Sequence, residues 1–518
     1  MRKLICIALF LIPQIVYSQD YPRKDFNLEK LTDEIFPIQD LDLNYEDLYE
    51  NLAQLLSNPI DLNSITREQL QGLFVVNENE IDKFLSYRTE NGPLLSVYEL
   101  QSIPDWSRAT FDKIIPFVTV IDPQSKLNSS LFKRVSEEKN NYLVIRIERS
   151  IETKKGYKSE TDSSQRYQGS PEKLYLRYRV SRSNDFSFGF TAEKDPGEVL
   201  QWLPSQQYYG LDYLSIHAQV MNKGKLKNLI VGDYQTQFGQ GLILGSAFGF
   251  GKNSETVTTV RRGNLGFLPY TSAGESNFFR GASGSYALSE NFTLHAFFSS
   301  TKKDGTINQE TEEDVVVSSF NASGLHRTPT EIQRRQRITE TGKGIVIQFR
   351  TSRIDAGAIF HQIDFSEPVL RTTFPYNQFA FNGSVNRNAG IFVNFHWSNF
   401  TFFTEAAQTI DHGNAITAGL LGNLSNQLEV SMLYRNFSKD FYSFYSNALS
   451  ESSTPQNEEG FYWGWKYSFN KKFTASGYMD IFQFPWLRYR SYSPSDGSEW
   501  LIRFNYTPSK KKYYYLYR

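Results

Sequence analysis

Apolar and polar side chains alternate along the stretch Ile391-Phe392-Val393-Asn394-Phe395-His396-Trp397-Ser398. Side chains on a β-strand point to opposite faces with a period of two residues, so this alternation predicts a strand with one apolar and one polar face. The same alternation recurs toward the C-terminus, most clearly over 174–181, 461–469 and 500–507. Many such strands, rich in Tyr, Phe and Trp, are typical of a transmembrane β-barrel.

The composition of the whole chain fits a barrel. The 518 residues are enough for more than one domain, the formal net charge is −1, and aromatic residues make up 15% of the chain. A net charge near zero gives no global sign of binding to nucleic acid or to anionic lipid. The aromatic share fits the belts of Tyr and Trp that barrels carry at both membrane interfaces. The mean hydropathy of −0.46 is compatible with a barrel because only every second strand residue must be apolar.

The first 18 residues have the features of an export signal. Arg2 and Lys3 provide a positive start, residues 4–16 an apolar core, and Ser18 the end of a cleavage site. The single cysteine, Cys6, lies inside this signal, so we expect a mature chain without thiols, disulfides or thiolate zinc sites. An export signal ahead of a barrel predicts the outer membrane of a Gram-negative bacterium.

The chain divides into four predicted parts. We assign 1–18 to the signal, 19–57 to a tether with an acidic helix, 58–123 to a small helical domain, and 141–518 to the barrel. The helical domain would lie in the periplasm, because the first barrel strand then runs outward and the long loops lie outside the cell.

Capping signals divide the helical domain into short helices. Thr66 with Gln69, and Ser96 with Glu99, read as capping boxes at helix starts. A glycine followed by proline, at Gly92, ends the helix between them. The spacing predicts helices that pair into two hairpins.

The domain carries a set of short motifs, namely Asp61-Leu62-Asn63, Glu68-Gln69-Leu70, Tyr87-Arg88, Glu90-Asn91-Gly92-Pro93, Ser96-Val97, Glu99-Leu100, Ile103-Pro104 and Phe117-Val118-Thr119-Val120. With these motifs, residues 58–121 resemble the tandem helix-hairpin-helix domain (RuvA domain 2-like) of the DNA-uptake protein ComEA and of related secretion-system proteins. The layout of signal, acidic helix, this domain and barrel resembles a group of Bacteroidetes-type envelope proteins.

The hairpin turns differ from those of DNA-binding relatives. The resemblance implies a Gly-hydrophobic-Gly turn whose backbone amides approach a phosphate. Residues 58–121 hold five bases and nine acids, a net charge of −4, whereas duplex binding needs cations. We therefore expect the turns to contact a protein partner, with nucleic acid as the alternative. The turn residues, none of them glycine, are Val75, Val76, Asn77, Asp105, Trp106 and Ser107.

Short and long connections alternate along the predicted barrel, as expected for short periplasmic turns and long outer loops. We count about 16–18 predicted strands, which is within the range of such barrels. Asp411-His412-Gly413 is short where a long connection is due. Residues 512–518 begin one more outward strand, which would either close the barrel early or be poorly paired if the chain is shorter than its relatives. The predicted short turns lie near 183–185, 222–224, 289–291, 352–353, 398–399, 425–426 and 470–471.

Two stretches in the predicted barrel invite a functional interpretation. The run 231–242 contains three glycines, which suits either a loop that folds into the lumen from Gly245 onward or a bend at the outer rim. We prefer the bend. The loop 302–341 changes from acidic to basic and could capture an anionic ligand such as a polysaccharide or DNA. We prefer a self-neutralising loop. Its candidate contacts are Arg327, Arg334, Arg335 and Arg337.

The sequence predicts no catalytic, cofactor or metal site. None of the six histidines falls at metal-ligand spacing with another histidine or carboxylate, and Asp411-His412 reads as a solvated turn. Most of the histidines should face the lumen. They are His217, His295, His326, His361, His396 and His412.

We therefore expect a non-enzymatic outer-membrane barrel. Its periplasmic module would dock an envelope protein or plug the lumen, in envelope assembly, secretion or transport. A DNA-uptake component is the first alternative. A barrel hydrolase, with acid or serine and histidine clustered at the rim, is the second.

Overall fold

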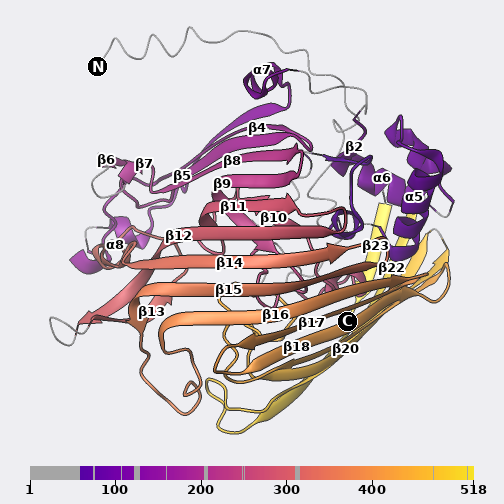
Figure 1. Ribbon diagram of the computed structural model, residues 1–518. Helices are drawn as coiled ribbons and strands as arrows, with labels where there is room; N and C mark the ends of the chain where they lie inside the picture. The colour runs from indigo at the N-terminus through magenta and orange to yellow at the C-terminus, as the bar shows by residue number, and fades with distance from the viewer. Residues whose placement is uncertain are drawn as a thin grey trace.

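A closed barrel of antiparallel strands carries a small helical unit at one end (Figure 1). The computed structural model describes residue 56 and residues 59–518, apart from 74–75, 105, 107, 122–128, 159, 204–207, 248, 250, 310–314, 471 and 510–511. The predicted signal and almost all of the predicted tether, 19–57, lie outside the described residues.

Within the described part of the chain, seventeen strands form the barrel wall, and strands that follow one another in the wall pair antiparallel. They are β3 (Asn141–Arg149), β4 (Glu172–Arg182), β5 (Phe186–Lys194), β8 (Tyr213–Lys223), β9 (Leu226–Gln237), β11 (Phe279–Ala287), β12 (Phe292–Gln309), β14 (Ile338–Arg350), β15 (Ile354–Val369), β16 (Gly383–Trp397), β17 (Phe400–Thr409), β18 (Asn414–Asn423), β19 (Leu428–Phe437), β20 (Glu458–Asn470), β21 (Phe473–Phe484), β22 (Ser495–Ser509) and β23 (Lys512–Tyr517).

The wall count lies within the predicted range but is odd, whereas barrels of this kind usually have an even number. The ring places β23 beside β3, and with an odd count these two strands run in the same direction. β23 pairs with β22 from Arg503↔Tyr517 to Tyr506↔Tyr514 and again at Ser509↔Lys512. The chain therefore adds a last outward strand to the wall, as the sequence predicts.

Along β16 the two faces differ as the alternation predicts. Ile391 is 60% exposed on the outer face, while Asn394 is fully buried on the lumenal face. The same division holds along β20 and β22, where Trp463 and Trp500 lie outside and Arg503 inside. A broad apolar outer surface is stable in contact with lipid, and the enclosed polar surface suits a lumen.

The connections confirm the predicted alternation. Each predicted short turn joins two wall strands at the end that carries the helical unit, and the long loops lie at the other end (Figure 1). Asn184, Asn222 and Ser398 adopt positive φ in these tight turns, as type I′ and related hairpins require. The exception at Asp411 is also confirmed, since β17 and β18 are joined by four residues.

The helical unit, residues 59–121, has its own buried apolar core, which includes Leu70, Phe84 and Phe117. The predicted capping boxes of Thr66 with Gln69 and of Ser96 with Glu99 are both present. Asn77 with Glu80 forms a third. The elements are β1 (Ile60–Asp61), α4 (Arg67–Gln71), α5 (Glu78–Asn91), the 3₁₀ helix η1 (Val97–Ser102), α6 (Arg108–Ile114), η2 (Ile115–Phe117) and β2 (Val118–Thr119), with β1 and β2 paired in parallel.

The remaining elements are smaller, and two of them pair with wall strands. Among the described residues, no helix is both long enough and apolar enough to cross a membrane. The remaining elements are α7 (Leu131–Glu137), η3 (Lys155–Tyr157), η4 (Ser163–Gln165), β6 (Gln201–Leu203), β7 (Tyr208–Gly210), η6 (Thr258–Val260), β10 (Gly266–Pro269), β13 (Val315–Asn321) and α8 (Pro329–Arg334).

The outer face of β16 provides a depth-resolved test of lipid contact. Ile391 lies near the middle of the strand, and Val385, on the same face, lies near its outer end beside the native Arg387. We expect Ile391→Arg to destabilise the barrel in lipid vesicles by about 2–4 kcal/mol and Val385→Arg by about 1 kcal/mol or less. Unfolding in denaturant, followed by heat-dependent gel mobility, measures both. Equal costs at the two positions would contradict the proposed lipid boundary.

Candidate functional site

A segment that follows β9 fills the middle of the lumen. This inner loop, residues 238–265, carries Phe238, Leu242 and Ile243, which are fully buried inside the barrel. The preferred sequence interpretation, a bend at the outer rim, is therefore wrong. The alternative, a loop that folds inward, is correct, although the chain turns in at Phe238 and not at Gly245. The rim interpretation failed because the group that holds the loop is far away in sequence.

That group is the carboxylate of Glu405 on β17. It accepts hydrogen bonds from the backbone N–H of Gln240 at 2.6 Å and of Leu242 at 3.1 Å. Gly239 and Gly241 adopt positive φ there, +59° and +76°, so the backbone curls around the carboxylate. A Cβ on Gly239 would lie 2.7 Å from a Glu405 oxygen. The glycines are thus required by a close approach between the loop and the barrel wall.

Further hydrogen bonds tie the inner loop to the opposite wall. The Gln240 amide donates to Asn394 of β16 at 3.0 Å. The Thr256 carbonyl accepts from Ser431 of β19 at 3.0 Å and from Tyr462 of β20 at 2.9 Å. The loop therefore spans the lumen from β9 to β20 and divides it into an outer and an inner part.

A second outer loop, between β19 and β20, also folds inward. Its Tyr445 ring stacks on Phe279 with 4.1 Å between ring centroids, and its backbone carbonyl accepts from Gly245 at 2.7 Å. Apolar side chains of the second loop pack against those of the inner loop. Together they form a buried apolar cluster, here called the constriction.

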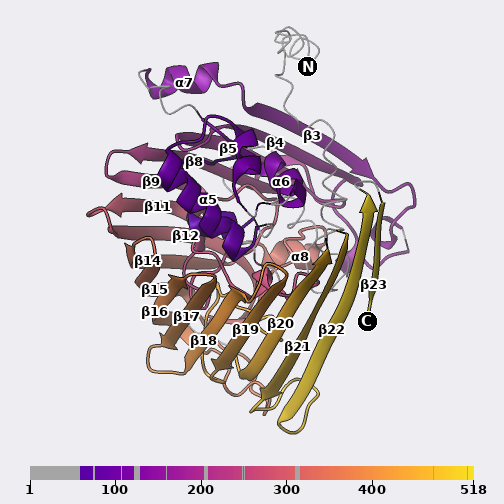
Figure 2. The ribbon, with the colours of Figure 1, turned by 90° about the vertical axis from the view of Figure 1, so that its right-hand side faces the viewer.

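The helical unit closes the other side of this partition (Figure 2). Thr401 of β17 donates to the Glu78 carboxylate at 2.8 Å. The Asn77 side chain donates to Glu429 at 3.3 Å and accepts from Asn423 at 3.4 Å. The start of α5 is therefore seated in the barrel mouth, against β17, β18 and β19.

The helical unit also touches the inner loop directly. Arg261 donates to the Gln71 side chain, and Leu265 packs near Gly72. Arg350 of β14 lies 3.9 Å from the Glu68 carboxylate. Burial raises the pKa of Glu68, but Arg350 and Arg261 outweigh it and hold the pKa below its usual value. Glu68 is therefore ionised in the mouth, in a fixed electrostatic contact.

The interface between the helical unit, the inner loop and the wall is well packed. A void of about 10 Å³ remains there, lined by Gln71, Glu78, Arg261 and their neighbours. Such a volume holds at most about one water molecule.

The predicted hairpin-turn residues take different roles. Val76 is 2% exposed in the core of the helical unit. Asn77 caps α5 and contacts the barrel. Trp106 is buried and donates its indole N–H to the Glu80 carbonyl at 2.7 Å. Val75, Asp105 and Ser107 lie outside the described residues. The first turn therefore faces the barrel, and Trp106 of the second supports the core.

At the outer end, His326 lies in a buried cluster that its sequence neighbourhood did not predict. Its Nδ1 is 2.5 Å from Asp212 and its Nε2 is 2.6 Å from Asp304. Arg335 lies 3.3 Å from Asp212, and Glu198 accepts the His326 backbone N–H at 3.0 Å. Ligand atoms of Glu198, Asp212 and His326 lie within 4.8 Å of one another. Sequence spacing gave no sign of this cluster, because its members come from segments far apart in the chain.

Ion pairs within this cluster join three outer segments, which carry Asp212, Asp304 and His326. Burial opposes the imidazolium, but the hydrogen bonds that its ring N–H groups donate to Asp212 and Asp304 raise the pKa of His326 to about 10. Burial, together with Asp212, raises the pKa of Glu198 to about 7. The histidine is thus a cation between two carboxylates at neutral pH.

The other predicted arginines of this loop differ in their surroundings. Arg327 donates to Glu331 at 2.8 Å and lies over the Tyr167 ring at 5.0 Å. Arg335 is paired with Asp212. Arg334 is half-buried in α8, and Arg337 is exposed. Two of the four arginines are thus neutralised locally. The acidic start of the loop, 310–314, lies outside the described residues.

Two adjoining cavities occupy the outer part of the lumen. They have volumes of about 610 Å³ and 740 Å³ and share Glu275, Asn277 and Tyr445 in their lining. We call them together the outer vestibule. It lies beside the inner loop, and its walls carry charged, amide and aromatic groups.

Comparison with known proteins adds little to this geometry. No family model matches the chain. No curated protein matches it. Crystal structures of Pseudomonas aeruginosa OpdQ, OpdL and OccK1 (OpdK) are similar at 14%, 13% and 10% identity and TM-scores of 0.34, 0.33 and 0.35. Each alignment covers 67% of this chain and 84%, 87% and 86% of theirs, respectively. At these scores the architecture is established by the strand pairing described above.

Gly239 and Gly224 form a matched pair that tests the Glu405 contact. Both have positive φ, +59° and +65°, but nothing lies within 4 Å of a Cβ on Gly224. Both alanine variants carry a backbone strain of about 1–3 kcal/mol, and only Gly239→Ala also collides with Glu405. We expect trypsin to cut after Arg261 and Arg262 in Gly239→Ala and to leave Gly224→Ala and the wild type intact there. Equal protection in both variants would contradict the role of Glu405.

The His326 cluster predicts a pH-dependent stability. Because the folded pKa of about 10 lies above the usual 6.5, the protonated ring stabilises the fold fully below pH 6.5. This contribution is lost as pH rises toward about 10. We expect the thermal midpoint of His326→Gln to fall below that of the wild type near pH 6 and to approach it near pH 10. His412→Gln, at an exposed loop tip, is the control. A difference that stays constant with pH would refute the charged lock.

Proposed function

We propose that this chain is a non-enzymatic transport barrel of the outer membrane whose lumen is closed by its own periplasmic helical unit. The outer apolar face of the strands supports the membrane location. The seating of the helical unit in the mouth, through Asn77, Glu78 and Glu68, carries the proposal of a plug.

The inner loop supports a closed resting state. It crosses the lumen between the outer vestibule and the helical unit, and it contacts the unit through Arg261. A solute that enters from outside would meet the constriction first, then the inner loop, then the plug. Passage therefore requires that the loop and the helical unit move together.

The polar character of the plug interface supports reversible closure. Its contacts are hydrogen bonds and ion pairs between partly buried groups, which can be exchanged for water at a modest net cost. A permanent seal would be expected to bury a larger apolar surface, as obligate interfaces do. The periplasmic face of the unit would then be free to receive an envelope partner that opens the barrel.

The same contacts weigh against a DNA-uptake role for the first hairpin turn, because Asn77 and Glu78 face the barrel. A complex of the full-length protein with duplex DNA that weakens steeply with added salt would nevertheless favour that alternative.

Opposite charges at one position test the plug. Thr401 contacts the Glu78 carboxylate at 2.8 Å, so Thr401→Glu places two carboxylates together and Thr401→Lys offers Glu78 a cation. Like charges at an interface cost several kcal/mol. We therefore expect Thr401→Glu to raise the open-channel frequency in planar bilayers about tenfold or more, and Thr401→Lys to stay closed like the wild type. Similar conductance in the two variants would contradict plugging by the helical unit.

A disulfide lock provides a second test. The Asn77 and Asn423 side chains are 3.4 Å apart, and the single cysteine of the chain, Cys6, lies in the predicted signal. We expect the oxidised Asn77→Cys/Asn423→Cys protein to lose all openings and to regain them on reduction. Openings that persist in the oxidised protein would show a conduction route past the helical unit.

A further inference from the structure

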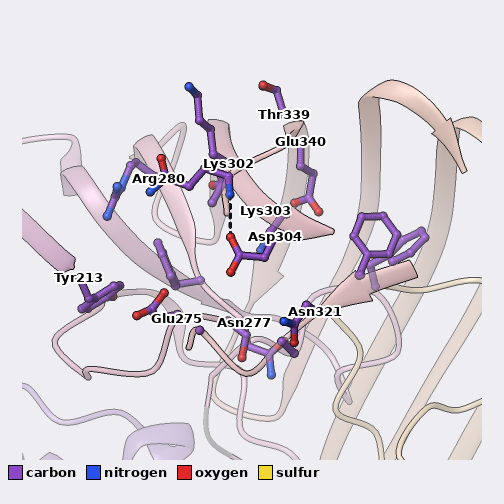
Figure 3. Close-up of a pocket in the computed structure, with 18 of the residues that line it drawn as sticks. Tyr213, Glu275, Asn277, Arg280, Lys302, Lys303, Asp304, Asn321, Thr339 and Glu340 are labelled. Carbon is purple, nitrogen blue, oxygen red and sulfur yellow. Dashed lines mark hydrogen bonds between the residues drawn. The ribbon is translucent and has the colours of Figure 1, made fainter. Parts of the chain in front are cut away.

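The smaller cavity of the outer vestibule has the features of a ligand site. Its volume is about 610 Å³, which suits a small organic molecule. Figure 3 shows Glu275 and Asn277 on one side and Lys302, Lys303 and Glu340 on the other. The two sides come from different segments, the loop before β11 and the strands β12 and β14.

Within the described part of the chain, two ionisable groups of opposite charge type in this cavity make no direct ion pair. Among the residues that the structure describes, Glu275 and Lys303 take part in no ion pair or hydrogen bond. The nearest other charged residues of the lining already contact other side chains. Arg280 pairs with Asp233 at 2.6 Å, and Asp304 contacts His326 at 2.6 Å. The cavity therefore offers a ligand one carboxyl group and one ammonium group that have no hydrogen-bond or ion-pair partner among the described residues.

Aromatic rings lie beside the free cation. The Lys303 ammonium is 5.4 Å from the centre of the Tyr445 ring and 5.9 Å from that of Phe278. Rings at this distance hold an ammonium in place by cation–π attraction. They also offer an apolar surface to a bound molecule.

Two buried hydroxyl groups in the lining also lack partners. Tyr213 and Thr301 are 6% and 5% exposed, and their hydroxyl oxygens have no hydrogen-bond partner within the described part of the chain. A buried polar group without a partner costs about 1–3 kcal/mol. A ligand with amide or carboxylate groups would remove this cost.

We propose that this cavity binds a small zwitterion, an amino acid or a short peptide, with its ammonium at Glu275 and its carboxylate at Lys303. A simple anion would leave Glu275 without a partner in the half-buried cavity. A neutral sugar would desolvate both ionic groups without compensation. Approach from outside rests on the proposed transport function, whereas binding itself does not require the plug to open.

The surroundings of Glu275 predict a proton release on binding. Burial, together with the nearby Asp212, raises the pKa of Glu275 well above its usual value. Glu198 and Asp304 also face it, whereas the cations near it are the imidazolium of His326 and the guanidinium of Arg280. A ligand ammonium favours the ionised carboxyl, so its binding lowers this pKa and releases a proton that the carboxyl carries.

Calorimetry on the full-length protein in detergent tests the proposal with matched probes. These are phenylalanine, the dipeptide Ala-Phe, N-acetyl-Ala-Phe, Ala-Phe-amide and a neutral disaccharide. We expect Ala-Phe or phenylalanine to bind with proton release, seen as a heat that depends on the buffer. Loss of either terminal charge should weaken binding about tenfold or more. Glu275→Gln should abolish discrimination against the N-acetyl form, and Lys303→Met that against the amide.

Glu290→Gln and Lys472→Met, exposed on the short-turn side, should bind like the wild type, and heat-dependent gel mobility reports folding of every variant. Absence of binding by both zwitterions, or equal binding of the capped forms or the disaccharide, would overturn the proposal. Because no probe needs to cross the barrel, these outcomes are separate from the conductance tests of the plug.

Discussion

The pairing of neighbouring strands around the barrel is the constraint on which the rest of this structure depends. A strand edge in lipid would leave N–H and C=O groups without partners, so the sheet must close on itself. Closure gives every wall strand one face toward lipid and one toward the lumen. The alternation of apolar and polar side chains around Ile391 and Asn394 follows from that requirement. Everything functional must then be built from lumenal side chains, from loops that fold inward, or from a separate unit at one end.

The lumen shows how a few buried polar groups organise such loops. Glu405 is fully buried, and a carboxylate in such a place is stabilised only if it accepts hydrogen bonds. The curled backbone at Gln240 and Leu242 supplies them. The inner loop is therefore held in place by its hydrogen bonds to Glu405 as much as by the packing of its own apolar side chains. Once the loop is fixed, Arg261 reaches the helical unit, so the inner loop connects the wall of the barrel to the unit in its mouth.

The sequence predicts those features that have a local cause. Contact with lipid imposes the two-residue period of the strands. Tight turns need residues such as Asn184 with positive φ, and a capping box needs two residues three positions apart. Strands, short turns and the starts of short helices could therefore all be predicted from the sequence. The inner loop could not, because Glu405 lies 165 residues from Gln240. Likewise, Asp212 lies 114 residues from His326. The glycines of 231–242 signalled a close approach, but the sequence alone does not name the group that approaches.

The features of the helical unit that argue against DNA binding acquire a positive explanation in the barrel mouth. A glycine turn would leave backbone amides free for a phosphate, whereas Asn77 and Glu78 use side chains to meet Glu429, Asn423 and Thr401. The excess of acids likewise has a counterpart, since Glu68 faces Arg350 and Arg261. A surface that contacts a fixed set of polar side chains is selected for matched donors and acceptors, and a phosphate-binding turn is selected for bare backbone. The two requirements are incompatible at one turn, so a turn that uses Asn77 and Glu78 to contact the barrel wall does not also offer a bare backbone to a phosphate.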